Sequence, residues 1–142
     1  MKKIILAILV IASITSCAST SSTVKADPEK EHILNLISEL RQDPASDYAK
    51  EKYEEILRFA TESSDVTVSL SEKTCPWLTK VENKKWGFYL LCGYIAGNIE
   101  KQLIDNQKKD NMEGGHKFVI MVYDAIKEVD KDFYSQEIEN LR

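Results

Sequence analysis

Apolar and polar residues follow the period of an α-helix along most of this chain. From residue 27 onward, apolar residues recur three or four positions apart, which is the spacing of a helix with one buried face. The first such stretch begins at Asp27-Pro28, an N-cap residue followed by proline, and ends before Pro44. The second carries an apolar stripe between Ala49 and Ala60, opposite a charged face. Both stretches predict helices that pack by one face.

The central part of the chain predicts a helix with a different environment. A long helix is expected over residues 84–105, and its first half is apolar nearly all round. Such a helix is surrounded by other elements, so we place it at the centre of the domain. A further helix is predicted over residues 118–129, with a short one after it. Residues 74–77 also have the composition of a helix start, and residues 106–115 predict a polar loop ending in two glycines with flexible or positive-φ backbone.

One short segment has the period of a β-strand instead. Val66, Val68 and Leu70 alternate with Thr67 and Ser69, as in a half-buried strand. No second segment of equal strength is present in the sequence. The segment is therefore an extended connector, which is the simplest interpretation, or part of a small pairing, or an edge offered to a partner. The predicted fold is mostly α: a compact bundle of about five helices over residues 27–142, with one central apolar helix and at most one short extended segment.

The first residues predict export. Two lysines at positions 2 and 3 precede an apolar run over residues 4–14, and the sequence Ile14-Thr15-Ser16-Cys17 ends this run. This order of basic, apolar and small residues is typical of a secretory signal peptide. With the cysteine at its end, the segment resembles the signal of a bacterial lipoprotein, in which Ile14 to Cys17 would be the lipobox. The resemblance implies cleavage before Cys17 and a lipid on its thiol.

This interpretation divides the chain into a signal peptide (residues 1–16), a flexible tether (17–26) and a helical domain (27–142). The expected location is the cell membrane or the outer membrane, with the domain in the periplasm or at the cell surface. Ordinary secretion and a retained anchor are the alternatives, although the apolar run is shorter than the roughly 20 residues of a membrane-spanning helix. The net charge of −4 disfavours nucleic acid and anionic lipid as partners, which leaves the acyl group as the membrane contact.

Two further cysteines, Cys75 and Cys92, lie in the predicted domain. In an exported protein they are candidates for a disulfide. The alternative is that both are small buried apolar residues. Their spacing and the two histidines of the chain do not indicate a zinc site, and we expect no metal and no cofactor.

The central helix contains the residues that we single out as functional candidates. Gly93 and Gly97 lie on one helix face, where small side chains allow another helix to come close. Tyr94, Asn98 and Gln102 continue along roughly one face. They either line a ligand cleft or form a boundary between core and solvent, with each amide capping a neighbouring loop.

Trp77 and Trp86 belong to an aromatic-rich region around the predicted disulfide. This region is expected in the core. Any exposed part of it is a candidate for contact with a protein, because tryptophan and tyrosine contribute much of the binding energy at interfaces.

The chain contains no recognisable catalytic motif, so we expect no enzyme. The predicted function is that of a cell-envelope lipoprotein whose helical domain binds another protein. A first alternative comes from Cys92, Gly93, Tyr94 and Gly97, which resemble a run in the helical immunity proteins paired with type VI secretion toxins. That resemblance implies an exported inhibitor of a toxin and carries over these four residues as structural positions. A second alternative is a small-ligand carrier with a cleft beside Asn98 and Gln102.

Overall fold

Five helices make up the regular structure of residues 27–142, the part of the chain that the computed structural model describes. They are α1 (Pro28–Leu40), α2 (Ala49–Glu62), α3 (Lys84–Asp105), α4 (Met112–Val129) and α5 (Gln136–Glu139). No β-strand occurs in this part of the chain. The predicted helical bundle is thereby confirmed. The predicted signal peptide, lipobox and tether lie outside the described residues.

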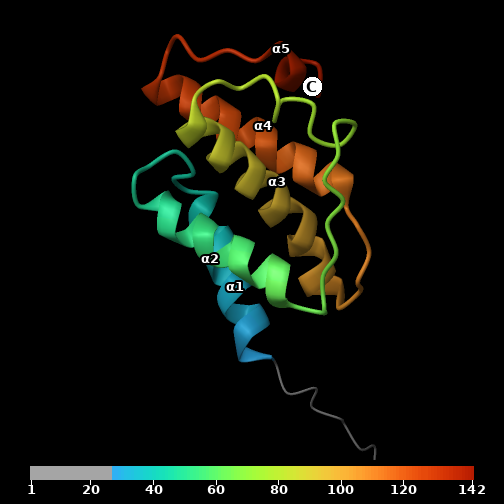
Figure 1. The fold of residues 1–142 in the computed structure, drawn as a ribbon. Helices are drawn as coiled ribbons and strands as arrows, with labels where there is room; N and C mark the ends of the chain where they lie inside the picture. Colours follow the sequence, from blue (N-terminus) through green and yellow to red (C-terminus); the bar gives the residue numbers. More distant parts are fainter. Residues whose placement is uncertain (1–26) are drawn as a thin grey trace, which may run out of the picture.

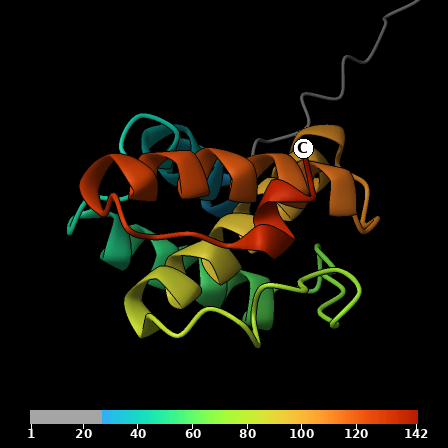
Figure 2. The same cartoon turned by 90° about the horizontal axis from the view of Figure 1, so that it is seen from above.

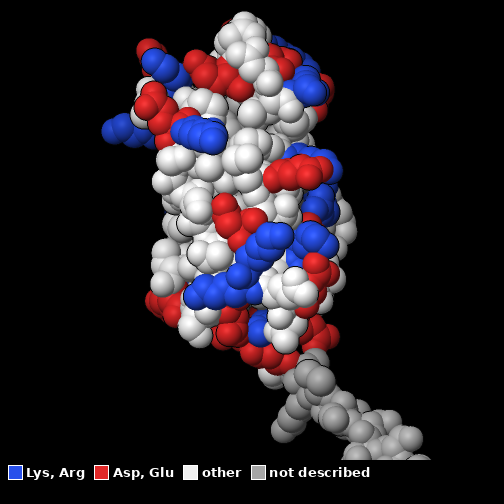
Figure 3. Space-filling model, turned by 90° about the vertical axis from the view of Figure 1, so that its right-hand side faces the viewer, with Lys and Arg blue, Asp and Glu red and all other residues white. Residues whose placement is uncertain are grey.

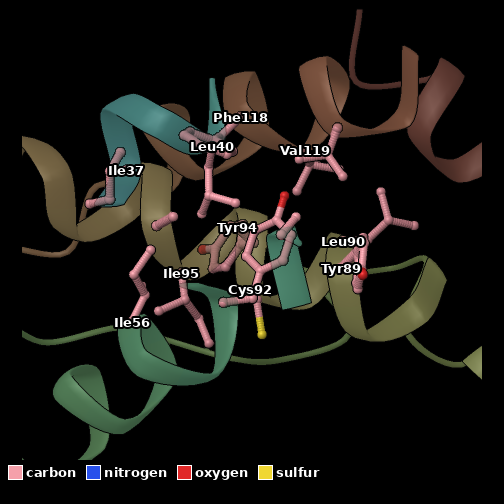
Figure 4. Close-up of a cluster of buried hydrophobic side chains, with 14 of the residues drawn as sticks. Ile37, Leu40, Ile56, Tyr89, Leu90, Cys92, Tyr94, Ile95, Phe118 and Val119 are labelled. Carbon is pink, nitrogen blue, oxygen red and sulfur yellow. The ribbon is translucent and has the colours of Figure 1, made fainter. Parts of the chain in front are cut away.

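Helix α3 is the centre of the bundle, as its apolar composition predicts. It packs against α1, α2 and α4, and Figures 1 and 2 show it between α2 and α4. The core seen in Figure 4 combines Ile37 and Leu40 of α1, Ile56 of α2 and Phe118 of α4 around side chains of α3. Helices α1 and α2 thus share one core with α3 and α4.

The predicted ends of the helices agree with the structure at several places. The Asp27 carboxylate accepts a hydrogen bond from the backbone N–H of Glu29 at 3.1 Å, and Pro28 occupies the first turn. Helix α3 begins after Asn83, whose side chain caps it, and ends at Asn106, which has a left-handed conformation with φ of 49°. Side-chain oxygens at the N-cap and a left-handed residue at the C-cap satisfy backbone groups that have no partner inside a helix.

The helix start predicted at residues 74–77 is wrong. The structure has only turns over residues 76–80, and α3 begins at Lys84. The Thr74 hydroxyl donates to the carbonyl oxygen of Ser69 at 3.0 Å and accepts from the N–H of Ser71 at 2.9 Å. Threonine side chains that bond to nearby backbone in this way favour turns over helix.

The glycine pair predicted to end a loop lies instead in the first turn of α4. Gly114 and Gly115 have helical backbone, and no glycine among residues 27–142 has positive φ. A Cβ atom on Gly115 would lie 2.6 Å from the ring of Tyr94, and one on Gly97 would collide with the carbonyl oxygen of Gly114. A Cβ atom on Gly93 would lie 2.8 Å from the side chain of Val122. The glycines therefore allow α3 and α4 to pack at close range, which is the role predicted for Gly93 and Gly97.

We predict that Gly97→Ala lowers the free energy of unfolding by about 1–3 kcal/mol, because the added methyl group collides with backbone that cannot move aside. Gly87→Ala is the matched control in the same helix. Its Cβ atom would meet nothing closer than 3.7 Å, so the better helix propensity of alanine should raise stability by up to about 1 kcal/mol. Urea unfolding of both variants measures the difference, and equal stability of the two would contradict the packing role of Gly97.

Candidate functional site

Residues 66–70, called here the extended segment, lie in the connection between α2 and α3. In Figure 1 this connection follows one side of the bundle, near the C-terminal end of α3. Val66 is buried and Val68 packs against the core, whereas the side chains of Thr67 and Ser69 are exposed. The predicted alternation holds for Val66 and Val68 but not for Leu70, which is exposed. The segment is the connector that the sequence favoured, without a neighbouring strand.

A glutamine side chain takes the place of a neighbouring strand at Thr67. The backbone N–H of Thr67 donates to Oε1 of Gln102 at 3.0 Å, and Nε2 of Gln102 donates to the carbonyl oxygen of Thr67 at 2.7 Å. A primary amide presents one acceptor and one donor side by side, as a peptide group does. Gln102 therefore forms with Thr67 the pair of hydrogen bonds that an adjacent strand would form.

A second buried amide, that of Asn98, connects this pair to the loop between α3 and α4. Oδ1 of Asn98 accepts from Nε2 of Gln102 at 2.8 Å and from the backbone N–H of Asn111 at 3.0 Å. Nδ2 of Asn98 donates to Oδ1 of Asp110 at 2.8 Å, and the same carboxylate oxygen accepts from the N–H of Ser69 at 3.1 Å. Asn98 is fully buried and Gln102 is 3% exposed, so the bond between their side chains is buried, whereas the bond from Ser69 to Asp110 lies at the surface. Bonds at both Thr67 and Ser69 thus hold the extended segment.

These bonds leave the two edges of the extended segment in different states. Successive residues of an extended chain direct their backbone N–H and C=O groups to opposite sides. The groups of Thr67 and Ser69 face α3 and its following loop, where side chains satisfy them. The backbone groups of Val68 and Leu70, called here the free edge, make no hydrogen bond within residues 27–142. Those of Val66 make none either, but Val66 is buried. The segment is therefore an extended connector with side-chain partners on one edge only.

The structure gives little support to the ligand cleft predicted beside Asn98 and Gln102. A hollow of about 190 Å³ lies next to Gln102, smaller than the roughly 300–1,000 Å³ of common ligand pockets. Both N–H groups of the Gln102 amide and its oxygen already have protein partners. The two amides satisfy backbone groups of neighbouring loops, which is the second of the two interpretations open for them. The hollow is lined by Lys101, Gln102, Asp105, Gln107, Lys109, Asp110 and Asn111.

The aromatic residues named as possible binding residues are in the core. Trp77 and Tyr94 are fully buried and Trp86 is 6% exposed, so none of them presents a surface to a protein. Nε1 of Trp86 donates to Oδ2 of Asp130 at 2.8 Å. The Trp77 ring packs against Tyr94 and His116, and its Nε1 is buried without a hydrogen-bond partner among residues 27–142. The expected core position is confirmed, and the possible contact role of these residues is wrong.

The predicted disulfide is absent, because Cys75 and Cys92 are free, buried thiols in this structure. Burial raises the pKa of Tyr53, and the Cys92 thiol adds to the increase; burial and the Cys75 thiol raise the pKa of Tyr94 in the same way. Residues 92 and 94 are two positions apart in α3 and point about 200° away from each other. Cys75, which neighbours Tyr94, therefore lies beside a different face of α3 from the one that carries Cys92, and the interpretation as small buried residues holds.

The sequence did not identify the partners of the two amides. Thr67, Ser69 and Asp110 take part through backbone or carboxylate groups in segments that read only as connector and polar loop. The alternating Val-Thr-Val-Ser pattern was the one feature of the sequence that pointed to the extended segment.

Among the described residues, no group of histidine, cysteine, aspartate and glutamate side chains is arranged to hold a metal ion. None of the helices over residues 27–142 has the length and apolar character to span a membrane.

We predict that Gln102→Leu loosens the extended segment. The substitution keeps the approximate size of the side chain but leaves both backbone groups of Thr67 without partners, which should lower the free energy of unfolding by about 1–3 kcal/mol. Hydrogen exchange of the Thr67 amide should become faster. Gln42→Leu, at an exposed position after α1, is the control. Unchanged exchange at Thr67 in the Gln102 variant would contradict the role of the amide.

We predict that both cysteines react slowly with alkylating reagents in the folded protein. Burial raises the pKa of the Cys75 thiol to about 11 and that of Cys92 to about 12, so little of the reactive thiolate exists at neutral pH. Unfolding should make both thiols react at once, as measured by mass spectrometry without reductant. A product without alkylation at either position after unfolding would mean that a disulfide is present after all.

Comparison of the chain with models of known protein families, with characterised proteins and with solved structures finds no match in any of the three. The resemblances to lipoprotein signals and to immunity proteins therefore stay predictions from the sequence.

Proposed function

We propose that this chain is an exported lipoprotein, anchored through Cys17, whose helical domain binds another polypeptide chain through the free edge of the extended segment. The role is one of binding, without catalysis. The free edge is the observation that carries this proposal. A row of unpaired backbone N–H and C=O groups in an extended chain is the site at which peptides add as a further strand.

The surroundings of the segment support such a role. Gln102 and Asp110 hold its other edge, so the segment is ordered before any partner arrives and loses less entropy on binding. Its exposed side chains, those of Thr67, Ser69 and Leu70, carry no charge. Figure 3 looks at the side of the molecule on which the connection from α2 to α3 lies, and it shows uncharged surface between groups of charged residues.

The N-terminal sequence supports the proposed location. A lipid on Cys17 would hold the domain at a membrane and raise its effective concentration toward other proteins at the same surface. Such an increase makes weak contacts, such as the addition of one short strand, effective.

The proposal is tested by photo-crosslinking from position 69 in the full-length protein, with Cys17 intact and in its own cells. We expect one predominant adduct from this position and none from position 51, an exposed residue of α2. Leu70→Pro should abolish the adduct, because it removes an N–H of the free edge that has no partner within the domain. Leu70→Ala, which keeps that N–H, should retain the adduct.

Two further results define the test. Equal adducts from Leu70→Pro and Leu70→Ala would mean that the free edge does not bind the partner. The variant Cys17→Ser should leave the membrane fraction and give less adduct. Continued association of this variant with membranes would overturn the anchoring through Cys17 but not the binding by the free edge.

A further inference from the structure

A second hollow lies at the end of the bundle where α3 begins and α4 ends. Its volume is about 390 Å³, within the range of roughly 300–1,000 Å³ for common ligand pockets. One wall comes from the connection before α3 and the other from the connection between α4 and α5, and Figure 1 shows both at the same end of the molecule. The second hollow is lined by Lys80, Val81, Glu82, Asn83, Asp130, Asp132, Phe133 and Tyr134.

The lining of the second hollow carries three carboxylates and one ammonium group. Glu82 and Asp132 are exposed, and their carboxylates form no hydrogen bond or ion pair within residues 27–142. Oδ2 of Asp130 accepts from Nε1 of Trp86 at 2.8 Å, while Oδ1 of the same carboxylate keeps its capacity to accept. Lys80 forms no ion pair with any of these carboxylates. The second hollow therefore offers acceptors for a cation that the described chain does not supply.

Two lysines that neighbour the second hollow in sequence are engaged elsewhere. Nζ of Lys85 lies 2.8 Å from Oδ1 of Asp47, and Nζ of Lys131 lies 2.9 Å from Oε2 of Glu128. The N–H groups at the start of α3, which would attract an anion, already donate to the Asn83 side chain. The C-terminal end of α4 adds partial negative charge beside the carboxylates. The helix ends thus agree with the side chains in favouring a cation.

An aromatic ring lies beside these carboxylates. Tyr134 is 61% exposed, and its hydroxyl donates to Oε1 of Gln136 at 2.7 Å, which holds the side chain while the ring stays accessible. Phe133 is half-buried and packs against Tyr123, with ring centroids 5.7 Å apart. A guanidinium group stacks on aromatic rings and forms forked hydrogen bonds with carboxylates, whereas an ammonium group is a strongly hydrated point charge. The combination favours guanidinium.

We propose that the second hollow binds an arginine side chain of a protein partner. This goes beyond the proposed function, because it adds a contact surface that does not include the free edge. The charge complementarity described above selects the arginine. A polypeptide is favoured over free arginine because the free amino acid would bring its own carboxylate to a surface that already has three. Val129, which is 66% exposed and precedes Asp130, offers apolar surface to the residues that flank the arginine.

The proposal is tested by NMR titration of the full-length protein in an uncharged detergent with N-acetyl-arginine amide, which has no carboxylate. We expect saturable shifts that are confined to residues 80–83 and 130–134 and to the indole N–H of Trp86. N-acetyl-citrulline amide has nearly the same shape without the charge and should give no saturable shift. N-acetyl-lysine amide should bind severalfold more weakly, because it cannot stack or form the forked hydrogen bonds.

Variants of exposed residues identify the groups that bind. Tyr134→Ala should weaken binding about two- to fivefold, the value of an exposed cation–π contact, whereas Tyr134→Phe keeps the ring and should retain binding. Asp132→Asn should weaken binding to a similar extent. Glu62→Gln, which removes an equal charge from an exposed position at the end of α2, is the control. Circular dichroism of all variants should match that of the unchanged protein.

The outcomes are distinguishable from those of the proposed function. Titration without saturation, equal binding of the arginine and lysine amides, or unchanged binding by Tyr134→Ala overturns the arginine site. Tighter binding of free arginine than of the amide would make the second hollow a small-molecule site and overturn the protein partner. Leu70→Pro should leave the titration unchanged, because residues 66–70 are not part of the second hollow. Failure at the free edge and failure at this site would therefore appear in separate experiments.

Discussion

The close contact between α3 and α4 is the constraint on which the rest of the domain depends. Gly97 and Gly114 bring the two helix backbones together, and a methyl group on either would collide with the other helix or with the Asn111 cap. Asn111 caps α4 through Gly114, and its own N–H donates to Asn98 in α3. The helix contact therefore places the loop before α4 against the buried amides. A larger residue at Gly97 would move this loop along with the helix.

The buried amides of Asn98 and Gln102 link α3 to the loop before α4 and to the extended segment at the surface. Asn98 and Gln102 are costly to bury unless each polar atom has a partner, and the structure supplies partners from the extended segment and from the loop after α3. These bonds act on one edge of the extended segment only. Side chains thus replace a neighbouring strand on the inside, while the outer edge keeps the hydrogen-bonding capacity of a strand. The same arrangement that stabilises the connection leaves backbone groups on its other edge without partners among the described residues.

The cysteines and aromatic residues show how burial changes the meaning of a sequence feature. Cys75 and Cys92 are close enough in sequence to suggest a disulfide, but one lies in the connection beside Tyr94 and the other on a different face of α3. Trp77 and Trp86, which would be strong contact residues on a surface, fill the core instead. In each case the residue type indicated a chemistry that its position in the fold does not allow.

The sequence by itself determined α1, α2 and α3, because the spacing of apolar residues and the capping residues act locally. The first helix begins after Asp27 and α3 spans residues 84–105, both as the pattern predicts. It also determined the alternation of the extended segment at Val66 and Val68. Only the tertiary structure decided that Gly114 and Gly115 are helical, because their conformation follows from the approach of α3. The tertiary structure likewise decided which backbone groups of residues 66–70 remain free. The Gln102 amide, which bonds to Thr67 on the inner edge, lies 35 residues away along the chain, and no local pattern connects it to the segment.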